Sequence, residues 1–392
     1  MTDVYLVSGA RTAIGSFMGS LSNHTPVQLG THAAKAAIER AAVDPTAIDN
    51  AFVAQIIPTA GEDLYTSRMV SIGAGMREDS DALTVNRLCG SGVQAIVSGA
   101  QSIMTGDAQL TLAAGNEVMS RAPYSVTGMR AGKKMGDGVL YDWLSGTVTC
   151  PFNGYLMGVT AENVAKKYGI SRERQDEFAA ESQRRAAAAM ANGTFAEQIA
   201  PIEVRKGRET VTFDVDEHPR ATTVEKLATL KPSFTKDGTV TAGNSSGIND
   251  GGAAVLLASG EAVKQHGLKP MARVAGWGMA GVAPNLMGIG PVAAVPKALA
   301  KAGITLDQVD VIESNEAFAA QALAVSDALG FDPAKTNPNG GGIALGHPVG
   351  ATGVMLAVKA IYEMHAAQAR YSLITMCIGG GQGIALVLEG AR

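Results

Sequence analysis

The sequence predicts an α/β fold built from two similar halves with a long segment inserted between them. Three observations predict it: strand-like and helical segments alternate over residues 1–117, they alternate again over residues 271–392, and one stretch of the first series matches one stretch of the second. Strands that alternate with helices form parallel or mixed sheets with helices packed on their faces. A duplicated pair of such units would bring equivalent turns from the two halves to a shared centre.

The first half is expected to hold four strands and three helices. Its strands are short apolar runs, and its helices repeat apolar residues at helical spacing. The strands are expected at 4–7, 51–57, 83–86 and 110–114, and the helices at 27–42, 65–74 and 92–105. The last of these helices starts just past a Gly-rich run that contains Cys89.

The second half repeats this order of elements. Strands are expected at 272–276, 309–313, 371–376 and 384–388, and helices at 292–302, 317–329 and 350–366. In both halves a Gly-rich run leads a helix, and the same interval of 17 residues then reaches the next strand, from Gly92 to Gln109 and from Gly353 to Arg370. This alignment places Cys377 at the strand end that corresponds to Asn116. We therefore interpret the two halves as an internal duplication.

The segment between the halves has a different character. Residues 120–154 are rich in Gly, Met and polar residues without periodicity, so we expect a loop there, followed by helices at 160–168 and 173–191. An insertion of this length in an α/β protein usually forms a lid or a binding subdomain. The expected division is an N-terminal half over 1–117, completed by about 248–270, an inserted loop domain over 118–247 and a C-terminal half over 271–392.

Composition and charge exclude several classes of protein. With 46% apolar and 17% charged residues over 392 positions, the chain can bury a large core, which excludes intrinsic disorder. The net charge of −4 provides no strong attraction to nucleic acid or to an anionic membrane. Three cysteines give no disulfide framework and favour a reducing compartment. No signal peptide or long apolar run is found, so a cytoplasmic location is expected.

The scarce reactive side chains lie in Gly-rich turns. Cys89 precedes Gly90-Ser91-Gly92, His347 lies between Gly346 and Pro348, and Cys377 opens a run that continues through Gly379-Gly380-Gly381. Glycines let the backbone approach a ligand closely and leave N–H groups to bind an oxyanion. A thiol placed just before a helix also has its thiolate favoured by the helix dipole. Cys89 is therefore a candidate nucleophile, and His347 is the base that would take its proton.

Other readings of these residues stay open at this point. Cys89 can be a small buried hydrophobe, and His347 a structural histidine that fixes its turn. Cys377 can be a resolving thiol, a zinc ligand or an acid/base group, although the chain has no Cys-x-x-Cys or His-x-x-x-His spacing to support zinc. Cys150 has no glycine partner and is interpreted as structural. Asn315 can cap a helix, or it can hold a water or a carbonyl oxygen at the centre.

Taken together, these segments resemble the thiolase family, the acyl-CoA acetyltransferases, over essentially the whole chain. The matching blocks are 86–92, 157–163, 241–247, 249–251, 315–318, 346–348 and 377–383. The resemblance implies the thiolase fold, with two duplicated α/β halves and mixed sheets in a layered α-β-α-β-α arrangement, plus an inserted loop domain. It also implies an acyl-CoA C-acetyltransferase that condenses acetyl-CoA with an acyl-CoA, or that cleaves 3-oxoacyl-CoA with coenzyme A.

The resemblance further implies a role for each residue of the centre. Cys89 would carry the acyl group, with His347 accepting its proton, and Cys377 would remove or return the proton on the α-carbon of acetyl-CoA. One oxyanion site would combine His347 with a water held by Asn315, and the other would use the backbone N–H groups of Cys89 and Gly379. No metal or redox cofactor is implied.

Coenzyme A would lie across the insertion. The resemblance places Ser246 and the backbone near Ala242 against its pantetheine arm and Arg220 at its adenine or phosphate end. The acyl and pantetheine region would be walled by Phe318, Met157 and Met287, although each methionine taken singly is more often a core residue. Residues 132–137 look like a tetramer-forming loop, which favours a homotetramer.

One departure from the family pattern concerns the acyl pocket. Many acetoacetyl-CoA thiolases carry a histidine just before the Met-Gly pair at 157–158, whereas this chain has Leu156. Leucine has no hydrogen bond to offer, so the pocket is expected to favour a longer or branched acyl group over the four-carbon substrate.

Three rival functions are weighed against this one. A decarboxylating ketoacyl synthase would lack the second glycine-flanked cysteine, Cys377. A thiolase-shaped lipid- or CoA-binding protein without catalysis is disfavoured because the full set of candidate residues is present. An NAD-dependent dehydrogenase is disfavoured because the run 379–383 precedes a strand and no acidic residue follows at the required distance.

Overall fold

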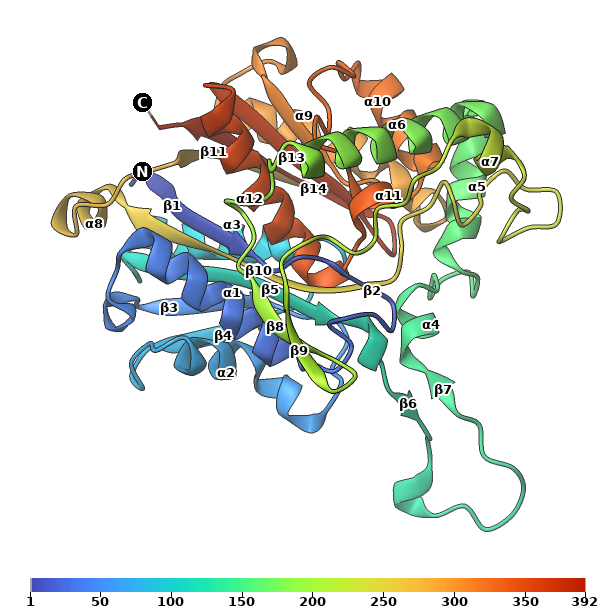
Figure 1. The fold of residues 1–392 in the computed structure, drawn as a ribbon, viewed down its shortest axis with the longest axis horizontal. Coiled ribbons are helices and arrows are strands. Elements are labelled where there is room, and N and C mark those ends of the chain that lie inside the picture. Colours follow the sequence, from blue (N-terminus) through green and yellow to red (C-terminus); the bar gives the residue numbers. More distant parts are fainter. Residues whose placement is uncertain (1, 392) are drawn as a thin grey trace.

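One ten-stranded sheet runs through both halves of residues 2–391, which the structure, a computed structural model, describes (Figure 1). Its strands lie in the order β12-β13-β14-β11-β1-β10-β5-β3-β4, with β2 paired to β10. Their bounds are β1 (Val4–Arg11), β2 (Gly15–Ser16), β3 (Asn50–Ala54), β4 (Asp81–Val85), β5 (Leu110–Val118), β10 (Asn249–Ser259), β11 (Ala272–Gly281), β12 (Val311–Ser314), β13 (Tyr371–Ile378) and β14 (Gln382–Gly390).

The strand order repeats between the halves. In the N-terminal half β3 runs parallel to β5, and β10 and then β1 follow antiparallel. In the C-terminal half β12 runs parallel to β13, and β14 and then β11 follow antiparallel. The two units meet where β1 pairs with β11 through Tyr5↔Arg273 and Leu6↔Ala272. The predicted duplication of α/β halves is confirmed.

Helices form the other layers. α1 and α2 pack on strands of the N-terminal half, and α9 packs on β11, β13 and β14 of the C-terminal half, while α12 contacts strands of both halves and α3 packs against α12. The helix bounds are α1 (Pro26–Ala41), α2 (Thr66–Gly73), α3 (Ser91–Thr105), α8 (Gly260–Gln265), α9 (Gly290–Ala302), α10 (Ala319–Leu329), α11 (Gly342–Leu345) and α12 (Val349–Ala366). Short 3-10 turns lie at Pro45–Ala47, Gly61–Tyr65, Met119–Arg121, Met129–Ala131, Pro284–Ile289 and Leu306–Gln308. These layers correspond to the expected α-β-α-β-α arrangement.

The two central helices cross at a pair of glycines. A Cβ added at Gly353 would lie 2.3 Å from the backbone nitrogen of Val93, and one added at Gly92 would lie 2.6 Å from that of Val354. Only glycine permits so close an approach of two backbones. Gly92 and Gly353 are also the residues that the internal alignment matches, so the duplication brings equivalent helix starts into contact at the centre of the molecule.

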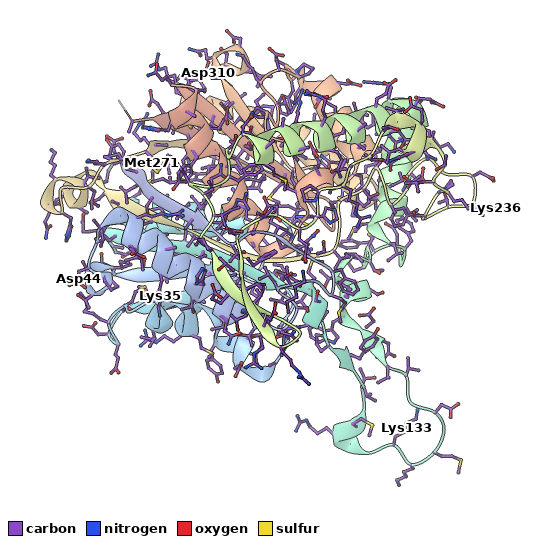
Figure 2. The ribbon with its side chains drawn as sticks, viewed as in Figure 1. Lys35, Asp44, Lys133, Lys236, Met271 and Asp310 are labelled. Carbon is purple, nitrogen blue, oxygen red and sulfur yellow. The ribbon has the colours of Figure 1, made fainter. Side chains whose placement is uncertain are left out.

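The helices of the insertion pack against α10 and α11 of the C-terminal half, and the insertion also sends out a long arm. Its elements are β6 (Tyr124–Ser125), β7 (Tyr141–Asp142), α4 (Trp143–Thr147), α5 (Met157–Tyr168), α6 (Arg172–Ala191), β8 (Ile202–Lys206), β9 (Glu209–Phe213) and α7 (Val224–Ala228). Residues 120–154 form mainly the expected loop, but they also contain the β6–β7 pair and the short α4. Figure 1 shows the arm projecting from the body, and Figure 2 places Lys133 near its tip.

One central strand escaped the sequence analysis. β10 pairs with both β1 and β5, and all of its residues are buried. Its paired glycines interrupt the apolar run, because α1 passes so close that a Cβ at Gly252 would lie 2.6 Å from the Leu29 carbonyl oxygen. The hairpin β8–β9 and helix α7 were also missed. No helix within residues 2–391 is sufficiently long and apolar to span a membrane.

Candidate active site

Cys89 lies in a strained turn between β4 and α3. The residue before it, Leu88, has a φ of 48°, a left-handed conformation that side chains with a Cβ rarely adopt. Ser91 holds the turn from both sides, because its hydroxyl donates to the Leu88 carbonyl at 2.6 Å and accepts from the Arg87 N–H at 2.7 Å. These contacts fix the backbone that carries the thiol.

Cys377 reaches the same place from the other half. It lies near the end of β13, and a Cβ at Gly90 would stand 2.5 Å from Cδ1 of Ile378, so only glycine lets the two turns approach so closely. Gly379, two residues beyond Cys377, lines the same cavity as Cys89, and its backbone N–H partly offsets the rise that burial causes in the pKa of the Cys89 thiol. The two predicted cysteines are therefore brought together, as the duplication required.

His347 is held at both ends of its ring. Its backbone N–H donates to Oδ1 of Asn249 at 3.0 Å. Its Nδ1 lies 2.7 Å from Oγ1 of Thr352, and its Nε2 lies 3.4 Å from Nδ2 of Asn315. Burial lowers the pKa of His347 to about 4. The imidazole is consequently neutral at pH 7 and able to accept a proton.

Asn315 does not cap a helix. α10 begins at Ala319, with Phe318 in the N-cap position, so the capping interpretation is wrong. The Asn315 side chain is buried instead beside His347, and its Oδ1 has no hydrogen-bond partner among the described residues. A buried amide oxygen in this position is free to accept a hydrogen bond from a water or a ligand.

Cys89, His347, Cys377 and Gly379 line one cavity, whose walls are mainly apolar. On the Cys377 side the wall belongs to a cluster formed by Cys150, Met157, Met287 and Ala317, with Phe318 packed against it. On the Cys89 side it belongs to a second cluster formed by Ile56, Ile57, Met119 and Val349, with Ile248 and Leu144 packed against it. Cys377 and Cys89 therefore lie beside two different apolar surfaces of one cavity.

Other predicted residues also line the cavity. Leu156, about 40% exposed, lies on its wall with Ser246, whose N–H donates to the Ala317 carbonyl at 3.0 Å. The rings of Phe318 and Phe234 meet edge to face with centroids 6.0 Å apart. Ala242 and Arg220 are exposed and lie outside the cavity wall.

The helix start does not bring the pKa of the Cys89 thiol below its ordinary value. Burial raises the pKa of its thiol above the ordinary value, and this outweighs the lowering by the backbone N–H of Gly379. Burial first, and the neighbouring Cys89 second, raise the pKa of Cys377. Desolvation disfavours an isolated charge here more strongly than a helix start favours it. Both thiols are neutral before substrate arrives.

Sequence reasoning missed the residues that support the centre. Glu117 is fully buried, and its carboxyl oxygens accept N–H groups of Ile56, Ile57 and Gly350 at 3.0–3.1 Å. Burial raises its pKa to about 8. A carboxylate at the end of an otherwise apolar strand is the signal that could have found it. Thr352 and the role of Asn249 gave no such signal.

A half-buried thiol, a buried thiol, a neutral imidazole and a backbone N–H in one cavity are the kinds of group that acyl transfer through a cysteine uses. Family models for the thiolase N-terminal and C-terminal domains match residues 4–261 and 268–390. The chain belongs to the thiolase family. Its activity is accordingly that of a thiolase, the reversible condensation of acyl-CoAs and the thiolysis of 3-oxoacyl-CoA.

Individual relatives agree along the full length. The chain is 52% identical to the beta-ketothiolase BktB of Cupriavidus necator over 99% of both proteins, and 48% identical to the acetyl-CoA acetyltransferase of Escherichia coli, again over 99% of both. Among solved structures, human mitochondrial 3-ketoacyl-CoA thiolase superposes with a TM-score of 0.98 at 44% identity, covering 100% of this chain and 99% of that one. The same human enzyme in complex with CoA gives a TM-score of 0.96, covering 100% and 98%.

Proposed function

We propose that this thiolase works through an acyl-enzyme on Cys89, with His347 and Cys377 as its acid/base groups. The observation that carries the proposal is the shared cavity, in which both thiols, the imidazole and the Gly379 backbone lie together. Each half of the chain supplies one thiol-bearing turn, so the site exists only when both halves are assembled.

In the first step the Cys89 sulfur attacks the thioester carbon and its proton moves to Nε2 of His347. The new carbon–sulfur bond forms as the bond to coenzyme A breaks, and the coenzyme A thiolate leaves with the proton from His347. Since both groups are neutral at rest, no buried charge has to be maintained before the substrate binds. Once protonated, Nε2 can donate to the thioester oxygen beside a water held by Oδ1 of Asn315.

In the second step Cys377 acts on the α-carbon of acetyl-CoA. In synthesis the Cys377 thiol first passes its proton to His347, which is neutral again once coenzyme A has left. The Cys377 thiolate then removes a proton from the α-carbon, the carbanion attacks the acyl group on Cys89, and the Cys89 thiolate that is expelled takes the proton from His347. In thiolysis these transfers run in reverse: the Cys377 thiol protonates the departing carbanion and regains a proton from His347. Backbone N–H groups of Cys89 and Gly379 would bind the acyl oxygen. Both steps balance with thiols and an imidazole alone, so we expect no metal or redox cofactor to take part.

Coenzyme A is proposed to bind along the inserted loop domain, 118–247. Ser246 and Phe318, which line the cavity, would contact the pantetheine arm, and the backbone near Ala242 would contact it outside the cavity. Arg220 is exposed outside the cavity, where it could meet the adenine or a phosphate group. The CoA complex of the human relative supports a CoA site in this fold.

The acyl group is proposed to be longer or more branched than acetyl. Leu156 offers no hydrogen bond at the cavity wall, and the surface facing Cys89 is formed by Ile56, Met119 and Val349. Thiolysis rates on four-carbon and longer 3-oxoacyl-CoAs test this preference. A sharp preference for the four-carbon substrate that Leu156→His leaves unaltered would remove the idea.

We also propose that the chain assembles as a homotetramer through its arm. The arm between β6 and β7 exposes large apolar side chains, which are costly to leave in water. They include Met129, Met135, Val139, Leu140 and Tyr141. Sedimentation of the intact chain and of a variant with Met135 and Leu140 changed to serine would test it, and unchanged tetramers in the variant would contradict it.

Two cysteine variants test the catalytic assignment. Cys89→Ser should prevent formation of the acyl-enzyme with acetyl-CoA, as read by the mass of the intact protein. Cys377→Ala should still form the acyl-enzyme but should not cleave 3-oxoacyl-CoA when coenzyme A is added. Cys150→Ala, which removes the third thiol, is the control and should retain both activities. Full thiolysis by Cys377→Ala would overturn the role of Cys377.

A further inference from the structure

The imidazole ring of His347 contacts the hydroxyl of Thr352, which also contacts a backbone carbonyl. Oγ1 of Thr352 lies 2.7 Å from Nδ1 of His347 and donates to the Pro348 carbonyl oxygen at 2.8 Å. Thr352 is 4% exposed and belongs to the first turn of α12, directly after the His347 turn. Its position is therefore fixed by the helix that crosses α3.

A threonine hydroxyl carries one proton, which sets the direction of both contacts. The Pro348 carbonyl can only accept, so the hydroxyl proton lies on that bond and Oγ1 presents a lone pair to the ring. Nδ1 of His347 must then carry the ring proton. A neutral imidazole has only one N–H, so Nε2 is left with a lone pair.

The contact at Nε2, on the other side of the ring, supports the same tautomer. Nε2 lies 3.4 Å from the amide nitrogen of Asn315, which is a donor and suits a lone pair there. With a proton on Nε2, two hydrogens would face each other. The same arrangement leaves Oδ1 of Asn315 pointing away, and that buried atom has no partner among the described residues.

We propose that Thr352 is a positioning residue that fixes the Nδ1–H tautomer of His347, so that Nε2 is free to take the Cys89 proton. This inference rests on the proposed role of His347 as the base. It adds that the competence of this base is set by a hydroxyl outside the cavity wall. When His347 becomes protonated, Thr352 accepts from a charged N–H, a stronger bond than the neutral one, so its effect is largest as the proton moves.

The kinetic test uses three variants. Thr352→Val keeps the shape but removes the acceptor, and it should slow acylation of Cys89 by acetyl-CoA roughly 10- to 100-fold, the value of a hydrogen bond to a charged group. The KM for acetyl-CoA should change little. Thr352→Ser should recover most of the rate. Thr336→Val is the matched control, since Thr336 is also buried and donates to the carbonyl four residues earlier, at 2.8 Å, but lies beside no imidazole.

The tautomer itself is read on the resting enzyme by ¹⁵N NMR of labelled histidine, with His347→Asn used to assign the ring signals. The expected result is a protonated Nδ1 and an unprotonated Nε2, with a mixed population in Thr352→Val. A resting protein with the proton on Nε2 would overturn the proposal, as would full-rate acylation by Thr352→Val. Because the NMR measurement needs no turnover, a failure of His347 as base would appear only in the kinetics and is distinguishable.

Discussion

The glycine pair at the helix crossing determines how far the nucleophile turn lies from the histidine turn. α3 starts two residues after Cys89, and α12 starts two residues after His347, so the separation of these helices is transmitted directly to the site. Gly353→Ala would place a Cβ 2.3 Å from the Val93 nitrogen. A relaxed contact is about 3.5 Å, so the helices must separate by roughly 1 Å.

The expected cost has two parts. Overpacking against backbone costs up to about 3 kcal/mol, and the better helix propensity of alanine returns about 1 kcal/mol, which leaves a loss of about 2 kcal/mol in unfolding free energy. A displacement of about 1 Å at reacting groups lowers a rate by about 100-fold. Gly353→Ala should therefore lose both stability and thiolysis.

Urea unfolding and the rate of 3-oxoacyl-CoA loss with added coenzyme A measure the two effects. Gly260→Ala is the control, because a Cβ there would meet only the Tyr5 ring at 3.7 Å. This variant should keep full activity. If Gly353→Ala had the stability and rate of the wild type, the helix crossing would not set the geometry of the site and the reasoning would be refuted.

Three further predictions follow from the charges and walls of the cavity. Because the pKa of Glu117 is raised from 4.5 to about 8, the folded protein holds a proton that the unfolded chain releases, so the free energy of unfolding should fall as pH rises between these values. Urea titrations across that range should show a smaller decrease for Glu117→Gln than for the wild type. The same decrease in both proteins would contradict this prediction. Because the pKa of His347 is near 4, the rate of Cys89 acylation should stay level from pH 8 down to about pH 5 and should fall below that as the imidazole is protonated. A fall in rate centred near the ordinary histidine pKa of 6.5 would contradict this prediction. Met119→Ala should raise the thiolysis rate on longer 3-oxoacyl-CoAs relative to the rate on the four-carbon substrate, whereas Met287→Ala, on the Cys377 side, should leave this ratio of rates unchanged. Equal ratios in the two variants would show that the acyl chain does not lie along the Cys89 side.

Much of the architecture follows from patterns that a single chain displays. Alternating strands and helices predicted the halves, and the equal spacing after Gly92 and Gly353 predicted their duplication, because a local repeat reflects a repeated unit. β10 could not be found in this way. Its Gly252 permits a close contact with α1, which lies more than 200 residues earlier in the chain, and such contacts leave no local periodicity.

The residues of the site likewise fall into two groups, those that the sequence indicates and those that only the fold reveals. Gly-rich turns indicated Cys89, His347 and Cys377, since scarce reactive groups beside glycines stand out in a sequence. Thr352 and Glu117 act through hydrogen bonds to neighbours that only the fold assembles. The pKa of Cys89 has a related explanation: a helix start is visible in the sequence, whereas the desolvation that raises the pKa of this thiol is not.

The electrostatics of the two thiols would also order the steps of the proposed reaction. The charge of a Cys89 thiolate raises the pKa of Cys377, so both sulfurs cannot be ionised together in this apolar cavity. Acylation of Cys89 replaces an ionisable thiol with a neutral thioester and removes that obstacle. In the proposed mechanism the Cys377 thiolate therefore forms more easily after Cys89 has been acylated. The carbanion would then form when its acceptor is already in place, and this order would follow from charge alone.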